Sequence, residues 1–142
     1  MLAHTAYREG EVCVNNILGK KDRINYNSVP AVIYTNPEVA AVGETAESVR
    51  QKGLKASVHS FTLKYSGRYV AENEKGDGIC KIIVDENTRN IIGLHIIGSY
   101  ASEIIYGAAM MIDAKMRVDD VRKVVFPHPT VGEVIREGCF MI

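Results

Sequence analysis

The sequence is poor in the features of disulfide-stabilised, nucleic-acid-binding and membrane-spanning proteins. Its 142 residues include only three cysteines, Cys13, Cys80 and Cys139, which are far apart and show no metal-binding or redox spacing. Seventeen basic and seventeen acidic side chains cancel, which leaves no electrostatic footprint for nucleic acid or an anionic membrane. No apolar run approaches the roughly 20 residues of a transmembrane helix, and no signal peptide opens the chain. We therefore expect a cytoplasmic protein without a metal site, a nucleic-acid partner or a membrane anchor.

Two motifs of cofactor and redox chemistry are missing as well. The sequence has no Gly-x-Gly-x-x-Gly dinucleotide fingerprint. The stretch Gly76-Asp77-Gly78 is interpreted as a turn and not as a phosphate-binding loop. The sequence also has no closely spaced cysteine pair. The chain is nevertheless long enough to enclose one hydrophobic core.

Apolar patterns predict an α+β fold, with a mostly antiparallel sheet of about four or five strands covered by helices. Strands are expected at residues 31–34, 38–42, 55–63, 79–84 and 91–97, and helices at residues 2–18, 46–52, 99–115 and 118–125. Residues 66–73 fit either a short helix or a loop.

Several local features refine this prediction. Residues 31–34 read as a buried strand, and 91–97, apolar on both faces, as the central strand. Thr45 is expected to cap the helix at 46–52, which Gly53 ends. Ser99 or Ser102 is expected to cap the long helix at 99–115. That helix is apolar over most of its circumference, which favours a twofold dimer, although a helix enclosed in a larger monomer would also explain it.

The most informative stretch is residues 124–137, where an apolar run leads into a histidine held between two prolines. Pro127 and Pro129 restrict the backbone, and Pro129 favours an extended conformation at His128. Thr130 and Glu133 have the spacing of a capping box. If Glu133 also reaches His128, the two form an imidazole–carboxylate pair suited to general acid–base chemistry. The alternative is that Glu133 only caps a helix and His128 lies in a surface turn.

The electrostatics of such a pair can be ranked. A helix N-terminus disfavours an imidazolium by roughly 0.3–1 kcal/mol. A charge-assisted hydrogen bond to Glu133 contributes roughly 1.5–3 kcal/mol, so the carboxylate should favour the charged form of His128. His95, on the expected central strand, is interpreted as a satisfied core histidine, or as one that supports a neighbouring site, and not as a metal ligand, because no second ligand has a useful spacing.

The stretch His128-Pro129-Thr130-x-x-Glu133 resembles the C-terminal signature of the pyridine nucleotide–disulfide oxidoreductases, most closely that of their dihydrolipoamide dehydrogenase branch. Further stretches resemble the same family in the same order. They are Met1-Leu2-Ala3-His4, Val29 to Gly43 (VPAVIYTNPEVAAVG), and Gly93 to Gly98 followed by Ala101-Ser102-Glu103. The resemblance therefore covers essentially the whole chain.

The resemblance implies that residues 1–27 are the tail of an FAD-binding domain and residues 28–142 an interface, or dimerisation, domain. The intact enzyme would oxidise protein-bound dihydrolipoamide, using FAD, a redox disulfide and NAD. His128 would be the acid–base catalyst, oriented by Glu133 and serving the active site of the partner subunit. Met1, Leu2, Ala3 and His4 would touch the flavin. The implied partners are a second copy of the chain and the lipoyl domain of a 2-oxoacid dehydrogenase complex.

Without the nucleotide fingerprints and the Cys-x4-Cys disulfide of the full enzymes, the chain alone is expected to bind no FAD and to be inactive. The resemblance also implies cis peptide bonds at Asn36–Pro37 and His128–Pro129. Two departures blur the subfamily: Phe126 stands where many dihydrolipoamide dehydrogenases have a histidine, and Gly132 where they often have serine.

Three alternatives remain open. Glutathione and mercuric reductases share the His–Glu pair. Cys139 near the C-terminus resembles the C-terminal thiols of mercuric and thioredoxin reductases, but those occur in pairs, and a lone cysteine is more often structural. The chain could instead be an autonomous dimerisation module without chemistry. A thiol–histidine hydrolase using His128 would need a nucleophile motif, which surrounds none of the three cysteines.

Overall fold

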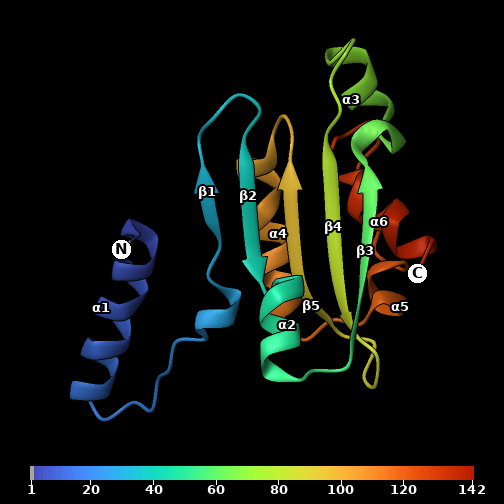
Figure 1. Cartoon of the computed structure of the whole chain (residues 1–142). Helices are drawn as coiled ribbons and strands as arrows, with labels where there is room; N and C mark the ends of the chain where they lie inside the picture. Colours follow the sequence, from blue (N-terminus) through green and yellow to red (C-terminus); the bar gives the residue numbers. More distant parts are fainter. Residues whose placement is uncertain (1) are drawn as a thin grey trace.

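A five-stranded antiparallel sheet forms the centre of the computed structural model, which describes residues 2–142 (Figure 1). The strands are β1 (Ala31–Ile33), β2 (Val39–Gly43), β3 (Ala56–Thr62), β4 (Ile79–Asp85) and β5 (Ile91–Ile97), in the spatial order β1-β2-β5-β4-β3. Every neighbouring pair is antiparallel. The predicted α+β architecture is confirmed.

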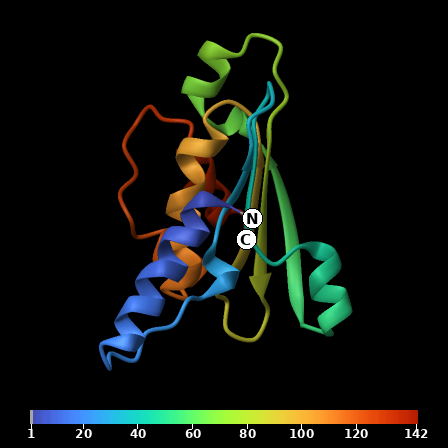
Figure 2. The same ribbon diagram turned by 90° about the vertical axis from the view of Figure 1, so that its left-hand side faces the viewer.

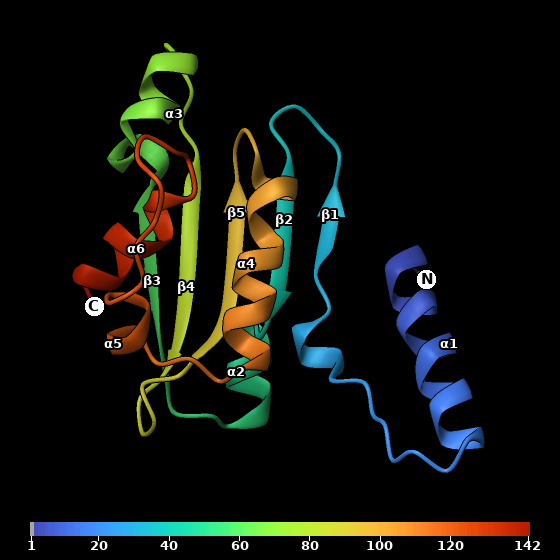
Figure 3. The same ribbon diagram turned by 180° about the vertical axis from the view of Figure 1, so that it is seen from behind.

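Helices cover the sheet unequally. They are α1 (Ala3–Ile17), α2 (Ala46–Lys52), α3 (Gly67–Glu72), α4 (Ala101–Asp113), α5 (Val118–Val121) and α6 (Glu133–Phe140), with short 3-10 turns η1 (Tyr26–Ser28) and η2 (Leu63–Tyr65). Figure 2 shows the sheet edge-on, with α4 on one side and α2 on the other, and Figure 3 shows α4, α5 and α6 together in front of the sheet. None of the helices in the described part of the chain is long and apolar enough to cross a membrane.

The core lies between the sheet and the layer of α4, α5 and α6. Ile91, Leu94 and Ile96 of β5 are at most 1% exposed and pack in one cluster with the buried face of α4. The prediction that β5 is the central strand is confirmed. Its expected burial on both faces is wrong at the end of the strand, where Ile97 is 42% exposed.

The first strand corrects a second expectation about burial. β1 pairs only with β2 and forms one edge of the sheet, so it has a neighbour on one side alone. Ile33 is consequently 61% exposed, and the prediction of a buried strand at 31–34 is wrong.

The helix caps are predicted correctly for α2 and incorrectly for α4. Thr45 accepts a hydrogen bond from the Ser48 backbone N–H at 3.0 Å, and Gly53 ends α2 in the left-handed region that glycine adopts without strain. Neither serine caps α4. Its N-cap is Tyr100, and Glu38 beside β2 accepts a hydrogen bond from the Ser102 backbone N–H at 2.9 Å. A carboxylate from a distant segment replaces the local cap.

The helix expected at 118–125 stops at Val121. The chain beyond α5 then stands away from the rest of the domain as an arm (Figure 2). Pro127 lacks a backbone N–H and restricts Phe126 to extended backbone, so a helix cannot continue toward it. Val125 is 91% exposed as a result.

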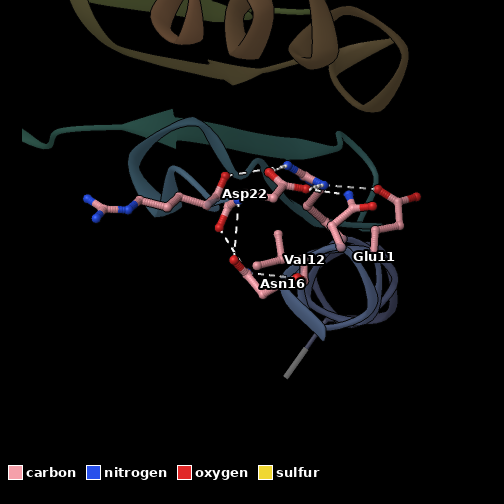
Figure 4. Close-up of polar contacts among 7 residues, drawn as sticks. Glu11, Val12, Asn16 and Asp22 are labelled. Carbon is pink, nitrogen blue, oxygen red and sulfur yellow. Dashed lines mark hydrogen bonds and ion pairs between the residues drawn. The ribbon is translucent and has the colours of Figure 1, made fainter. Parts of the chain in front are cut away.

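Polar contacts, and not core packing, hold α1 against the segment that follows it. The helix has no buried residue. Arg8 Nη1 donates to Asp22 Oδ2 at 2.8 Å, and Asn15 Nδ2 donates to the same oxygen at 2.7 Å. Asn16 binds the backbone of Asp22 through both its amide oxygen and its amide nitrogen (Figure 4). Asp22 is therefore the centre of the contact.

The contact between α1 and Asp22 should be lost in acid. The hydrogen bonds from Arg8 and then Asn15 lower the pKa of Asp22 from 3.8 to about 2. Because the folded-state pKa is depressed, the stabilisation is complete above the ordinary value near 3.8 and is lost as the pH falls toward about 2. We expect the amides of α1 to lose protection from hydrogen exchange across this window, while those of β5 stay protected. In Asp22→Asn, which cannot titrate, α1 should be weakly held at every pH; an acid step of the same size in that variant would contradict the assignment.

Candidate active site

The histidine loop, residues 124–132, connects α5 to α6 and carries the proline–histidine motif. The His128–Pro129 peptide bond is cis, as is Asn36–Pro37, and both predictions are confirmed. The His128 side chain is 76% exposed. The loop therefore presents its imidazole to the outside of the domain.

His128 and Glu133 form the pair that the sequence left open. The Nδ1 atom of His128 lies 2.7 Å from Oε1 of Glu133. A carboxylate can only accept here, so Nδ1 carries the hydrogen, and the neutral ring keeps its lone pair on the outward Nε2 atom. An oriented imidazole with a free Nε2 can take a proton from an external group and later return it.

Glu133 divides its two oxygens between two partners. Oε2 accepts a hydrogen bond from the Thr130 backbone N–H at 2.8 Å, while Oε1 accepts from His128. Burial raises the pKa of Glu133, but the hydrogen bonds from Thr130 and His128 outweigh it and leave that pKa below its ordinary value. Glu133 is therefore a carboxylate at neutral pH.

The predicted capping box is only half correct. Gly132, and not Thr130, is the N-cap of α6, and it makes no side-chain cap. The Thr130 hydroxyl donates to the carbonyl of Pro127 at 2.8 Å instead. Glu133 does reach back to the backbone of Thr130, but this bond braces the histidine loop and does not begin a helix.

The predicted flavin-contacting residues lie in a different part of the chain. Met1 is outside the described residues, and Leu2, Ala3 and His4 lie at the start of α1, on the opposite side of the domain from the histidine loop (Figure 3). The His4 ring hydrogen-bonds the Pro30 carbonyl at 2.7 Å. The structure thus does not bring the two predicted sites together within one chain.

Other candidate ligands and nucleophiles have no such arrangement. The described residues contain no cluster of three or more histidine, cysteine or acidic side chains able to hold a metal. His95 is half-buried, and its ring forms a hydrogen bond with the Glu44 backbone. Its Nε2 atom has no hydrogen-bond partner among the described residues, so the expectation of a satisfied histidine is only half correct. Burial raises the pKa of Cys80 to about 12 and that of Cys139 to about 11, which leaves both as unreactive thiols.

A hollow beside the histidine loop was not foreseen from the sequence. Its volume is about 230 Å³, and three separate segments line it: Arg68 of α3, Tyr100 and Ile104 at the start of α4, and Thr130, Val131 and Gly132. Segments so far apart in the sequence give no local signal. The hollow shows that the N-terminal end of α4 and the histidine loop share one surface.

A different part of α4 is also exposed. Tyr106 and Met110 are 64% and 65% exposed, although they lie on a helix whose opposite face is in the core. An exposed apolar helix face of this kind marks an interaction site. Fold and site together define an α+β domain that presents an exposed His–Glu pair and an exposed apolar helix face.

Comparison with known proteins identifies that class. Residues 29–139 match the family model described as "Pyridine nucleotide-disulphide oxidoreductase, dimerisation domain". The chain belongs to this family.

Two relatives of the chain are dihydrolipoyl dehydrogenases. The chain is 39% identical to the mitochondrial dihydrolipoyl dehydrogenase of Caenorhabditis elegans over 97% of its own length and 28% of the relative's. It is also 39% identical to the mitochondrial dihydrolipoyl dehydrogenase of Pisum sativum, over 98% of this chain and 28% of that protein. The chain thus spans less than a third of these relatives.

Solved structures agree with this assignment. The crystal structure of LpdA from Mycobacterium tuberculosis matches with a TM-score of 0.91 and 25% identity, over 99% of this chain and 30% of that one. The flavoprotein disulfide reductase RclA of Escherichia coli shares the fold, with a TM-score of 0.82 and 24% identity over 93% of this chain and 31% of that one. The chain is therefore a dimerisation domain of the kind found in dihydrolipoyl dehydrogenases and related flavoprotein disulfide reductases.

Proposed function

We propose that the chain supplies the acid–base pair of a dihydrolipoyl dehydrogenase, an enzyme that oxidises protein-bound dihydrolipoamide with FAD, a redox disulfide and NAD. The observation that carries the proposal is the 2.7 Å contact between His128 Nδ1 and Glu133 Oε1 on a ring that is 76% exposed. This geometry leaves Nε2 free for an external thiol.

The role of the pair follows from thiol chemistry. A thiolate, and not a thiol, attacks a disulfide. Nε2 of His128 takes the proton from the substrate thiol, and the sulfur electron pair then forms a bond to one sulfur of the enzyme's disulfide while the S–S bond breaks. Glu133 orients the ring and stabilises its protonated form. The three cysteines of the chain are free thiols, and, as the family resemblance implies, we assign the disulfide to another part of the intact enzyme, on the partner subunit.

A twofold homodimer supports this arrangement. The exposed face of α4, with Tyr106 and Met110, supplies an apolar surface for the second copy. The same helix reaches the histidine loop at its start, where Tyr100 and Ile104 line the hollow. Association through α4 therefore carries His128 to the edge of the partner, and a contact of about 1,600 Å² would be ordinary. The lipoyl domain of a 2-oxoacid dehydrogenase complex would reach His128 from the solvent side.

The start of α1 suits the cofactor that the family implies. The first N–H groups of a helix have no intrahelical partner, and those of α1 have no side-chain cap and no acidic residue in the first turn. Leu2, Ala3 and His4 could thus direct backbone donors at an oxygen atom of the flavin, which accepts and passes on electrons when bound. Because α1 has no buried residue, we assign residues 1–27 to the tail of the FAD domain and 28–142 to the interface domain.

A substrate comparison tests the proposal. In the intact enzyme, dihydrolipoamide should reduce the flavin rapidly, and NAD should reoxidise it. Glutathione disulfide or Hg²⁺ with NADPH should turn over far more slowly. Preferential turnover of either alternative substrate would place the chain in another branch and overturn the assignment, while a dimer without turnover of any of them would favour the dimerisation module.

A further inference from the structure

The histidine loop contacts the rest of the domain through the buried Val131 and the partly buried Phe126, which pack with the core, and through very few hydrogen bonds. Most of its hydrogen bonds stay within residues 121–136; for example, the Arg136 side chain donates to the Val124 carbonyl at 3.2 Å. Among the described residues, a single hydrogen bond joins the loop to a segment outside this range. The Ser66 hydroxyl donates to the Thr130 carbonyl at 2.8 Å, across 64 residues of sequence.

Ser66 is unusual among the polar residues of the chain. Glu44 and Ser66 are the only buried polar residues in the part of the chain that the structure describes, and Ser66 is 1% exposed. A buried hydroxyl is unfavourable unless its hydrogen bonds are made. Ser66 makes two, because it also accepts from the Tyr69 backbone N–H at 3.2 Å and so caps α3.

The turn that carries Ser66 is fixed to the sheet. Leu63 is fully buried, and its backbone N–H donates to the Gly78 carbonyl at 2.9 Å. A Cβ atom on Gly78 or Gly98 would lie 2.4 Å or 2.2 Å from a methyl carbon of Leu63, so the leucine occupies space that only glycine leaves open. Ser66 N–H in turn donates to the Leu63 carbonyl at 2.9 Å. The Ser66 hydroxyl therefore belongs to a turn that is firmly attached to the sheet.

The restraint continues from Thr130 to the catalytic pair. The Thr130 N–H donates to one oxygen of Glu133, whose other oxygen binds the His128 ring. We propose that Ser66 is a positioning residue for this pair: its hydroxyl anchors Thr130 to the sheet and thereby fixes Glu133 and the direction of His128 Nε2. The inference rests on the proposed function only for its kinetic consequence.

Titration of Glu133 in the 142-residue chain tests the anchor without requiring turnover. In Ser66→Ala the Thr130 N–H should be held less firmly against Glu133, so the pKa of the Glu133 carboxyl, followed by carbon NMR, should rise. The charged and titratable groups that face this carboxyl are His128 and Arg136, and both remain in every variant. Ser66→Thr, which keeps the hydroxyl, should restore the original titration.

Two further variants separate anchoring from helix capping. Ser66→Gly removes the hydroxyl but remains an acceptable N-cap, and it should shift the titration as Ser66→Ala does, even where Ser66→Ala folds poorly. Thr45→Ala removes a capping hydroxyl from α2, on the other side of the sheet, and should shift nothing. An unchanged Glu133 titration in Ser66→Gly, or an equal shift in Thr45→Ala, would overturn the inference.

In the intact enzyme, Ser66→Ala should lower kcat by about 10- to 100-fold with little change in KM, since a displaced acid–base group weakens the chemical step. Loss of kcat in His128→Gln with no effect of the Ser66 variants would refute the anchor and leave the proposed function standing. A shifted pKa of Glu133 in the Ser66 variants, together with full activity of His128→Gln, would support the anchor and overturn the proposed function.

Discussion

Replacing His128 by Gln in the intact enzyme should slow the reduction of flavin by dihydrolipoamide by roughly 10²–10⁴-fold, the usual contribution of a positioned acid–base group. Glutamine is close in size and can still donate to Glu133, but it cannot take a proton from a thiol. The measurement is the stopped-flow loss of oxidised-flavin absorbance after mixing with dihydrolipoamide.

A second histidine provides the matched control. His59 on β3 hydrogen-bonds the Ser57 hydroxyl at 2.8 Å and belongs neither to the histidine loop nor to α6, so His59→Gln should leave the rate unchanged. Flavin content and dimerisation should also be unaffected in His128→Gln, because the side chain is exposed and packs in no core. A rate within threefold of the unmodified enzyme would exclude His128 as the proton acceptor.

What the sequence predicts well depends on local chemistry. The turn ending α2 at Gly53 and the central position of β5 follow from residues that are neighbours in the chain. The His128–Glu133 pair belongs to the same class, because its members are five positions apart in the sequence and a proline restricts the backbone between them. Spacing could not decide between a helix cap and a His–Glu pair, since Glu133 has two oxygens and binds the Thr130 backbone with one and the His128 ring with the other.

The errors arise where distant segments replace local ones. Glu38 caps α4 from 64 residues away, so neither nearby serine is needed. Ser66 reaches Thr130 across the same separation in sequence. Periodicity carries no information on such contacts, nor on the place of β1 at the sheet edge. The His128–Glu133 pair was therefore predictable from the sequence, but the contact between Ser66 and Thr130 that supports it was not.

A charged residue on the exposed face of α4 should separate the subunits. Met110 is 65% exposed in the single chain, and an apolar anchor at the centre of an interface typically contributes about 2 kcal/mol or more, which corresponds to roughly 30-fold in the dissociation constant. We expect sedimentation of the unmodified chain at tens of micromolar to show a dimer, and Met110→Asp to raise the dissociation constant by at least that factor. Val58→Asp, at a 42% exposed position of β3 on the sheet, is the matched control and should remain dimeric.

The same variant connects association to catalysis. If His128 serves the disulfide of the partner subunit, a Met110→Asp monomer retains its own flavin and its own His128–Glu133 pair, yet has no partner to act on. Its flavin should then be reduced by dithionite as before, but by dihydrolipoamide at least 10²-fold more slowly, as in His128→Gln. At protein concentrations high enough to restore the dimer, the rate should recover, which no loss of folding would allow. A monomer that is fully active with dihydrolipoamide would show that each chain completes its own site, and would contradict the shared site.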